Sequence, residues 1–325
     1  METKKIAITG ASGYIGQMLV ERLAKAPGIK ILALDLVKPG RLPPGVEFAP
    51  CDVRDPAITR RFQGCDVVVH LAFIVAAIHD REAIYDINTR GSRNVLNACE
   101  EAGVGKLVVA SSVAAYGRQP RDNRRITEDT PRRGDSASYY LHTKRLLEED
   151  LDLFEKRNPK IVLTRIRPSI LLGKNNRNFV HELARFPRVP KVREGLYLPV
   201  VHEEDVIDAF ELAVMKDAPG PFIISLPEPT SMEDMARALD KDTISMSRAQ
   251  LLFLSRLGFK LHLTLFSPDW IVSGDTQWRF DISRAKNVLG WEPKHDLPST
   301  IQEMADTIRK NWWLNRLRER LGIQG

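Results

Sequence analysis

Tyr140 and Lys144 lie four residues apart in a segment, residues 139–157, whose apolar residues recur at helical spacing. On a helix, this spacing places a phenol and an ammonium on one face. A phenol, with an ordinary pKa of about 10, is a poor base at neutral pH, but a nearby cation favours its phenolate form. The pair can therefore exchange a proton with a substrate hydroxyl or carbonyl, provided that a bound cofactor exchanges hydride with the same carbon.

Three glycines near the N-terminus indicate which cofactor that is. An expected strand at residues 6–9 leads directly into Gly10, Gly13 and Gly16, and an expected helix follows. Glycines at this spacing let the backbone turn tightly and approach a pyrophosphate, while the unpaired N–H groups of the helix start face the phosphates. Asp35 ends the second apolar run and would accept hydrogen bonds from the adenosine ribose hydroxyls. These residues predict a dinucleotide site.

The type of dinucleotide depends on the charges beside the second expected strand. The Asp35 carboxylate would repel a 2′-phosphate, which favours NAD. Lys38 and Arg41 follow closely and keep NADP as the alternative.

Short β-branched runs alternate with helical patterns through the first half of the chain. This alternation predicts an α/β fold, a doubly wound parallel (Rossmann) sheet with helices on both faces. The expected strands are residues 6–9, 31–35, 46–49, 67–71, 107–111 and 161–166, and the expected helices are residues 17–26, 88–102 and 139–157.

After Gly173 the pattern loosens, with prolines at 187, 190 and 199, before a helix at residues 205–215 and a strand at 221–226. We therefore expect a smaller, discontinuous C-terminal substrate domain. The expected division is an NAD-binding Rossmann domain at residues 1–173 and 203–228, and a substrate-binding domain at residues 174–202 and 229–325.

Composition narrows the class of protein. The 325 residues are 43% hydrophobic and carry a net charge of +6 from 48 basic and 42 acidic residues spread along the chain, which argues against nucleic-acid binding. The three cysteines show no C-x-x-C spacing, so no disulfide framework or metal site is expected. We expect a cytoplasmic enzyme, because no signal peptide opens the chain.

Charges and a proline interrupt the apolar residues 251–272, which excludes a transmembrane helix. A packed helix pair, a substrate lid and a membrane-surface contact remain open as interpretations of this segment.

Several ordered motifs extend over nearly the whole chain: residues 10–16, 51–53, 70–73, 86–91, 111–117, 140–144, 165–173, 199–206 and 280–293. With these motifs the chain resembles the extended short-chain dehydrogenase/reductase family, the NAD-dependent epimerase/dehydratase group. The resemblance implies a catalytic triad in which Tyr140 is the acid/base. Lys144 would lower the pKa of Tyr140 and bind the nicotinamide ribose, and Ser112 would orient the reacting oxygen.

The resemblance also implies how the cofactor is bound. The segment at Asp52 and Val53 would meet the adenine, Leu71 and Ala72 would lie along the cofactor, and Asn88 would be structural or hold a water of the proton relay. The full set of expected cofactor residues is Gly10, Ser12, Gly13, Tyr14, Ile15, Gly16, Asp35, Asp52, Val53, Leu71, Ala72, Asn88, Tyr140 and Lys144. His202 is interpreted as structural or near the cofactor, since the H-E-x-x-H metal spacing is absent.

Two departures from the family pattern bear on the reaction. Ile170 stands where nucleotide-sugar enzymes often carry Asn, and Val113 and Ala114 stand where 4,6-dehydratases carry an Asp-Glu pair. A dehydratase is therefore not expected. The leading hypothesis is an NAD(P)-dependent oxidoreductase acting at a secondary alcohol or ketone.

Two alternatives stay open. The first is a nucleotide-sugar epimerase with tightly held NAD, in which Arg177, Arg185 or Arg193 holds the substrate pyrophosphate. The second is a non-catalytic cofactor-binding module. The resemblance also implies a homodimer formed by the helices at residues 88–102 and 139–157. The basic loop at residues 118–133 is interpreted as a solvated surface or as a contact for an anionic substrate group.

Overall fold

The computed structural model describes residues 3–75, 81–119, 125–134, 138–175, 186–193, 195, 197–261 and 278–321. Seven strands form one sheet in the order β11-β6-β5-β4-β1-β2-β3, and every neighbouring pair is parallel. The strands are β1 (Lys4–Thr9), β2 (Ile29–Asp35), β3 (Glu47–Pro50), β4 (Val67–His70), β5 (Lys106–Ala110), β6 (Val162–Pro168) and β11 (Gly220–Ile224). The order 3-2-1-4-5-6, extended by one strand, is that of a dinucleotide-binding Rossmann sheet. The predicted fold class is confirmed.

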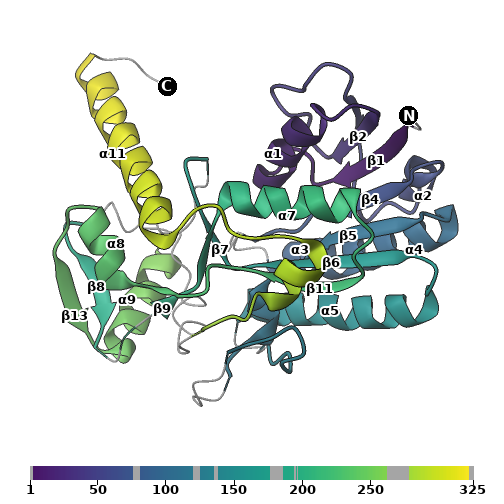
Figure 1. Cartoon of the computed structure of the whole chain (residues 1–325). Helices are drawn as coiled ribbons and strands as arrows, with labels where there is room; N and C mark the ends of the chain where they lie inside the picture. The colour runs from purple at the N-terminus through teal and green to yellow at the C-terminus, as the bar shows by residue number, and fades with distance from the viewer. Residues whose placement is uncertain are drawn as a thin grey trace.

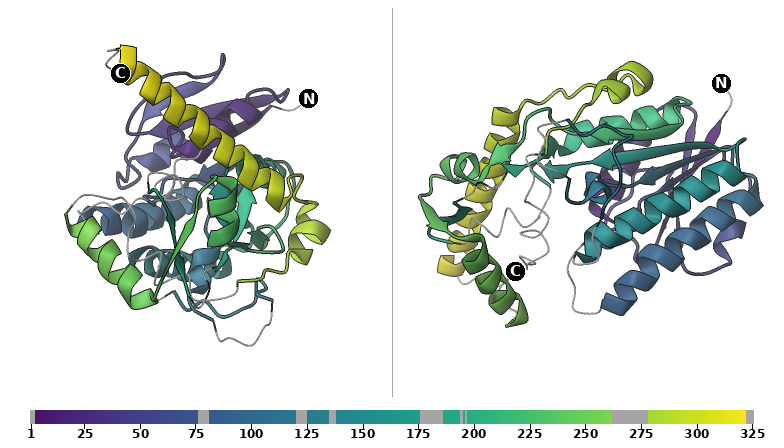
Figure 2. Two further views of the ribbon diagram at one scale, coloured as in Figure 1. Left: turned by 90° about the vertical axis from the view of Figure 1, so that its left-hand side faces the viewer. Right: turned by 90° about the horizontal axis from the view of Figure 1, so that it is seen from below.

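Helices cover both faces of this sheet (Figure 1). One face carries α1 (Tyr14–Leu23) and α7 (Glu203–Met215), and the other carries α2 (Ile58–Phe62), α4 (Ser92–Ala102) and α5 (Tyr139–Arg157). Helix α3 (Arg81–Tyr85) leads through a π-helical turn, η1 (Asp86–Gly91), into α4. A 3-10 turn, η2 (Val113–Tyr116), follows β5. Figure 2 shows α4 and α5 lying side by side on the outside of the molecule.

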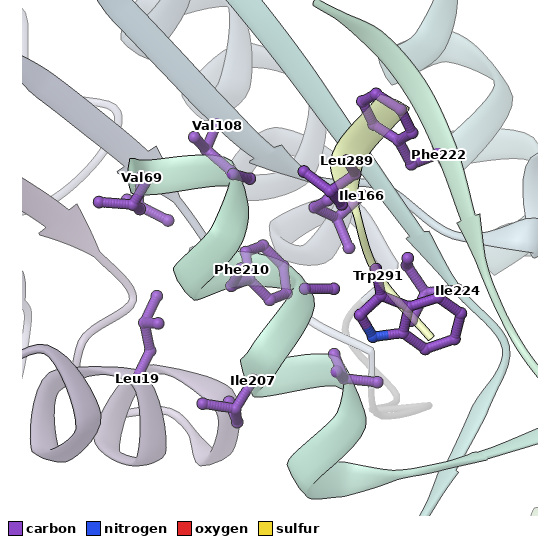
Figure 3. Packing of buried hydrophobic residues seen from close by; sticks show 14 of the residues in the cluster. Leu19, Val69, Val108, Ile166, Ile207, Phe210, Phe222, Ile224, Leu289 and Trp291 are labelled. Carbon is purple, nitrogen blue, oxygen red and sulfur yellow. The ribbon is translucent and has the colours of Figure 1, made fainter. Parts of the chain in front are cut away.

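Each face of the sheet has its own apolar core. Phe210 on α7 packs with Ile166 and Val108 of the central strands on one face (Figure 3), while Leu151 and Phe154 of α5 pack on the other. Trp291 completes the first core, together with Leu289 in a second π-helical turn, η3 (Ala285–Leu289). Its indole N–H donates to the Asp205 carbonyl at 2.7 Å. The late segment at 278–291 therefore packs on the Rossmann sheet, although it lies far from β11, the last strand of that sheet, in sequence.

A third apolar cluster lies beyond the carboxyl ends of the strands, to the left in Figure 1. It is built around Val189, Met235 and Met304. Its elements are β7 (Ile170–Leu172), β8 (Val189–Val192), β9 (Tyr197–Leu198), β10 (Val200–His202), β12 (Thr230–Ser231), α8 (Met232–Ala238), β13 (Thr243–Met246), α9 (Arg248–Lys260) and α11 (Leu297–Leu321). They form two-stranded pairs, β10 with β7, β12 with β9 and β13 with β8.

Helices α8 and α9 both begin with a capping box, in which Ser231 and Ser247 accept from the backbone three residues later. The apolar segment at 251–272 is described only in its first half. Residues 251–260 belong to α9, whose Phe253, Leu254 and Leu257 are exposed. Residues 262–272 lie outside the described residues. Across the described part of the chain, the helices fall short of the length and apolarity that crossing a membrane requires.

Candidate active site

The glycine turn between β1 and α1 is built so that only glycine fits. Gly10 has φ +70, and a Cβ added there would lie 2.6 Å from the Ala72 backbone nitrogen. A Cβ on Gly16 would lie 2.1 Å from the Gly10 carbonyl oxygen. Both distances are shorter than non-bonded atoms tolerate. At Gly10 the turn therefore packs directly against the backbone of Leu71 and Ala72, and at Gly16 the start of α1 packs directly against the turn. Gly13 precedes the first residue of α1, whose free N–H groups point out of the helix start. This cradle fits a pyrophosphate.

The residues predicted around the adenosine end lie next to this turn. The Asp35 carboxylate, at the end of β2, accepts from the Ser12 backbone N–H at 3.0 Å. The Asp52 carboxylate binds Arg54, accepting from its backbone N–H at 2.9 Å and from its guanidinium, and this contact holds the pKa of Asp52 below its usual range. Val53 is buried beside Gly91. The structure brings these side chains to the same edge of the sheet as the glycine turn.

The segment after β4 runs past the cofactor turn and is held by Asn88. Leu71 donates its backbone N–H to the Thr9 carbonyl at 3.1 Å, which keeps Leu71 and Ala72 next to β1. The Asn88 amide accepts from the Ile74 N–H at 2.8 Å and donates to the Ile74 carbonyl at 3.0 Å. Asn88 thus clamps the segment that follows β4.

The three predicted triad residues meet at the carboxyl end of β5. Ser112 follows the strand and accepts from the Ala114 N–H at 3.1 Å, while Tyr140 and Lys144 reach it from the first turns of α5. Tyr140 is hydrogen-bonded to the Ser112 side chain. Lys144 Nζ donates to the Ala110 carbonyl at 2.9 Å and lies 3.4 Å from the centre of the Phe73 ring.

Burial sets the protonation of this group. Burial raises the pKa of Tyr140, and the hydrogen bond from Ser112 opposes that rise. Burial lowers the pKa of Lys144 to about 7, and the negative charge of Glu148 opposes that fall. His70 is neutral, because burial lowers its pKa to about 3. Its ring lies between the Thr9 and Ser92 hydroxyls, at 2.8 and 3.0 Å.

Two side chains at the site were not predicted from the sequence. Phe73 lies edge-on to Tyr140, with ring centres 6.3 Å apart, and covers Lys144. Glu203 is fully buried, and its carboxylate binds the Tyr14 hydroxyl of the glycine turn and the Asn175 amide. Phe73 and Glu203 lie within the motifs at residues 70–73 and 199–206, but Glu203 is followed by two more acids, so no local pattern distinguishes it.

The remaining predicted positions have simpler surroundings. His202 contacts Glu303 through Nε2 at 2.5 Å and stacks on His295 with ring centres 3.7 Å apart. Within the described ranges, no group of three or more His, Cys, Asp or Glu side chains is placed to hold a metal ion. Arg193 donates its backbone N–H to Met246, and Arg132 of the basic loop pairs with Asp152. Arg177 and Arg185 lie outside the described residues.

A parallel sheet that ends in a glycine cradle, with an acid at the end of β2, defines a dinucleotide-binding Rossmann protein. A profile of the NAD dependent epimerase/dehydratase family matches residues 6–221, more than half of the chain. The chain belongs to this family. It is an NAD-dependent enzyme of the oxidoreductase type.

Individual relatives cover different parts of the chain. A 2-alkyl-3-oxoalkanoate reductase of Shewanella oneidensis is 29% identical over 248 residues, which are 70% of this chain and 63% of the reductase. The sterol-4-alpha-carboxylate 3-dehydrogenase, decarboxylating, of Homo sapiens is 30% identical over 197 residues, 59% of this chain and 51% of that enzyme. The crystal structure of UDP-glucuronic acid 4-epimerase from Bacillus cereus in complex with NAD has a TM-score of 0.74 at 20% identity, covering 95% of this chain and 99% of that chain, and so shares its fold.

Proposed function

We propose that this protein is a dehydrogenase or reductase that interconverts a secondary alcohol and a ketone, with Ser112, Tyr140 and Lys144 as its catalytic triad. One observation supports the proposal most directly. The side chains of Tyr140, Ser112 and Lys144 lie together at the end of β5, on the same sheet edge as the glycine turn. NAD, when bound, accepts or supplies hydride at the reacting carbon.

Each residue of the triad has a defined role in this proposal. Tyr140 donates a proton to the ketone oxygen in reduction and accepts it from the alcohol in oxidation. The Lys144 cation stabilises the phenolate that forms, and it would also hold the nicotinamide ribose of NAD. Ser112 donates a hydrogen bond to the reacting oxygen and fixes its distance from Tyr140.

The proposed cofactor contacts follow the sheet edge. Asp35 would receive the adenosine ribose, Asp52 and Val53 would flank the adenine, and Leu71 and Ala72 would line the cofactor along its length. Ser12, Tyr14 and Ile15 would face the pyrophosphate, since they flank Gly13 at the start of α1. Asp35 favours NAD over NADP by repelling a 2′-phosphate.

Apolar side chains lie next to the triad, which supports a substrate less polar than a sugar. Phe73 lies against Tyr140, and Val113 and Ala114 follow Ser112. Ile170 begins β7 at the place where nucleotide-sugar enzymes often carry Asn. The Shewanella relative is named for reduction of an oxoalkanoate and the human relative for dehydrogenation of a sterol carboxylate. We propose a keto or hydroxy substrate with an apolar body.

The test is a spectrophotometric assay of NADH against a panel of 3-oxoalkanoates, sterol ketones and nucleotide sugars. We expect stoichiometric NADH oxidation with an apolar ketone. Tyr140→Phe should lower kcat by about 100-fold or more, because the proton donor is lost. Tyr197→Phe changes an exposed tyrosine and should leave the rate unchanged. A Tyr140→Phe variant with wild-type turnover would overturn the proposed mechanism.

A nucleotide-sugar epimerase is the second candidate, favoured by the shared fold with the Bacillus enzyme. It predicts NAD retained through purification and conversion of a nucleotide sugar with no net NADH change. Mass spectrometry of released small molecules, with the same nucleotide-sugar panel, separates the two candidates.

We also propose the domain division, the dimer and the location of the protein. The NAD-binding domain would comprise residues 1–173 and 203–228, and the substrate-binding domain would comprise residues 174–202 and 229–325. Within the second domain, residues 278–291 pack back on the Rossmann side. Two copies would associate through α4 and α5, which lie side by side (Figure 2). The enzyme would work in the cytoplasm.

A further inference from the structure

Glu148 lies one helical turn beyond Lys144 on α5, and its side chain is fully buried. The Ser111 hydroxyl donates to its Oε1 at 2.5 Å. Arg167 donates to both carboxylate oxygens, each at 2.7 Å, and Arg165 donates to Oε2 at 3.2 Å. The carboxylate is therefore held between the end of β5 and the strand β6.

Helix α5 consequently bonds to three consecutive residues of the chain that leaves β5. Lys144 binds the Ala110 carbonyl, the buried carboxylate binds the Ser111 hydroxyl, and Tyr140 binds the Ser112 side chain. The three bonds come from positions i, i+4 and i+8 of one helix face. They fix the register between the strand end and the helix, and therefore the distance between the serine and tyrosine of the proposed triad.

We infer that Glu148 is a positioning residue of the proposed site: it fixes the strand end that carries Ser112 and supplies a negative charge that favours the protonated form of Lys144. This inference rests on the proposed function. Glu148 touches neither substrate nor cofactor in this scheme and acts through Ser111 and Lys144.

The charge half of the inference follows from the surroundings of Lys144. The charged and titratable side chains around Lys144 and Glu148 come from five elements. They are Tyr140 on the same helix, His70 at the end of β4, Arg165 and Arg167 on β6, Tyr116 in η2, and Arg132 in the loop before α5. His70 is neutral and the three arginines pair with Glu148. The Glu148 carboxylate is therefore the negative charge that offsets the burial of Lys144. The arginines hold the pKa of Glu148 at about 2, so this charge persists at every working pH.

An ion pair that only stabilises the fold would behave differently, and Asp152 provides the matched comparison. Asp152 also binds Arg165, at 2.6 Å, and Arg132, but it is one third exposed and lies a further turn along α5. Asp152→Asn removes a partner of the same arginine and leaves the bond between Ser111 and Glu148 in place.

The experiment titrates Lys144 directly, by NMR of the full-length protein carrying 13Cε-labelled lysine, with the resonance assigned from Lys144→Arg. We expect Glu148→Gln to lower the titration midpoint of Lys144 by about one pH unit or more, because an opposite charge is lost. Asp152→Asn should leave the midpoint unchanged. An equal midpoint in both variants would overturn the charge half of the inference.

Ser111→Ala tests the positioning half and keeps the buried ion pairs intact, so it serves even if Glu148→Gln fails to fold. We expect kcat to fall about tenfold with KM for NADH unchanged, because the strand end shifts relative to Tyr140. The titration of Lys144 should stay as in wild type. Full kcat in Ser111→Ala would overturn this half. A wild-type protein without NADH turnover would instead contradict the proposed function, while the lysine titration would still decide the role of the charge.

Discussion

The Lys144 ammonium is buried, which favours its neutral form, although the Phe73 ring and the Ala110 carbonyl that it contacts both stabilise the cation. Its pKa of about 7 means that the cation is present below neutral pH and is lost as the pH rises through 7. Tyr140 stays protonated over this range, since burial raises its pKa. Tyr140, the proposed acid for reduction, is therefore protonated throughout. The group that titrates is Lys144, whose charge stabilises the Tyr140 phenolate.

We expect kcat/KM for ketone reduction to decline above about pH 7 in the wild-type enzyme, because kcat/KM reports the groups of the enzyme before substrate binds. Lys144→Arg keeps a cation at every pH and should remove this decline while lowering the rate, since a guanidinium has a different shape. The measurement is a series of initial rates from about pH 5.5 to about pH 9, in steps of about half a pH unit. A flat wild-type profile would contradict the assignment.

Gly10 gives a second prediction at this scale. Gly10→Ala forces a side chain into a position with φ +70 and 2.6 Å from the Ala72 nitrogen. We expect a loss of about 1–3 kcal/mol in stability from the backbone strain and a far weaker affinity for NADH, because the turn must open. Gly40→Ala is the control, since a Cβ there meets nothing within 4 Å. Fluorescence titration with NADH and urea denaturation check both, and equal affinities in the two variants would refute the packing argument.

At the scale of elements, β6 is unusual because a central strand carries two buried arginines. Strand residues alternate between faces, so Arg165 and Arg167 point toward α5 while Ile166 points into the opposite core. The arginines meet Glu148, Asp152 and other acids of α5 there. An ionic layer thus lies between this strand and this helix, next to the apolar packing of Leu151 and Phe154.

Arg167→Met should destabilise the protein by about 3–5 kcal/mol at pH 7, since it leaves the buried Glu148 carboxylate short of a partner. The control is Arg93→Met, which removes the pair between the half-exposed Arg93 of α4 and Asp150 of α5 and should cost at most about 1 kcal/mol. Both values come from urea denaturation.

The pH dependence of that cost follows from Glu148. Its pKa in the folded protein is about 2 against an ordinary 4.5, so its contribution is complete above 4.5 and is lost as the pH falls from 4.5 toward 2. The destabilisation by Arg167→Met should therefore shrink toward pH 3, where the carboxyl of the variant is protonated. A cost independent of pH would show that packing, not charge, accounts for it.

The sequence predicted these elements better than their contacts. Strands β1, β2, β4 and β5 were predicted within two residues at each end, because parallel strands buried on both faces are continuous apolar runs. The glycine turn and the i, i+4 pair of Tyr140 and Lys144 were visible because their chemistry depends on local spacing. The partners of Glu148 were not, since they depend on how α5 lies against β6. Phe73 was placed over Lys144 by a loop whose path no local pattern specifies.

At the scale of the whole molecule, α4 and α5 form the outer layer on one side of the sheet (Figure 2). Leu153 of α5 is 58% exposed there, among charged neighbours. If this layer is the proposed dimer interface, Leu153→Arg places a large charged side chain in it and should give a monomer at micromolar concentration. Met215→Arg alters a residue 48% exposed at the end of α7, on the opposite side, and should leave the mass unchanged. Light scattering after gel filtration measures both, and a monomeric wild type would reject the interface.

The place of β11 in the sheet has a consequence for synthesis on the ribosome. Strand β6 ends at Pro168 and its edge neighbour β11 begins at Gly220, so residues 169–219 must be translated between them. At about 5–20 residues per second, this leaves the edge of β6 without its neighbour for several seconds. An open strand edge is a template for pairing with another chain. The nascent protein is therefore exposed to such pairing after its first six sheet strands have emerged, until β11 covers the edge of β6.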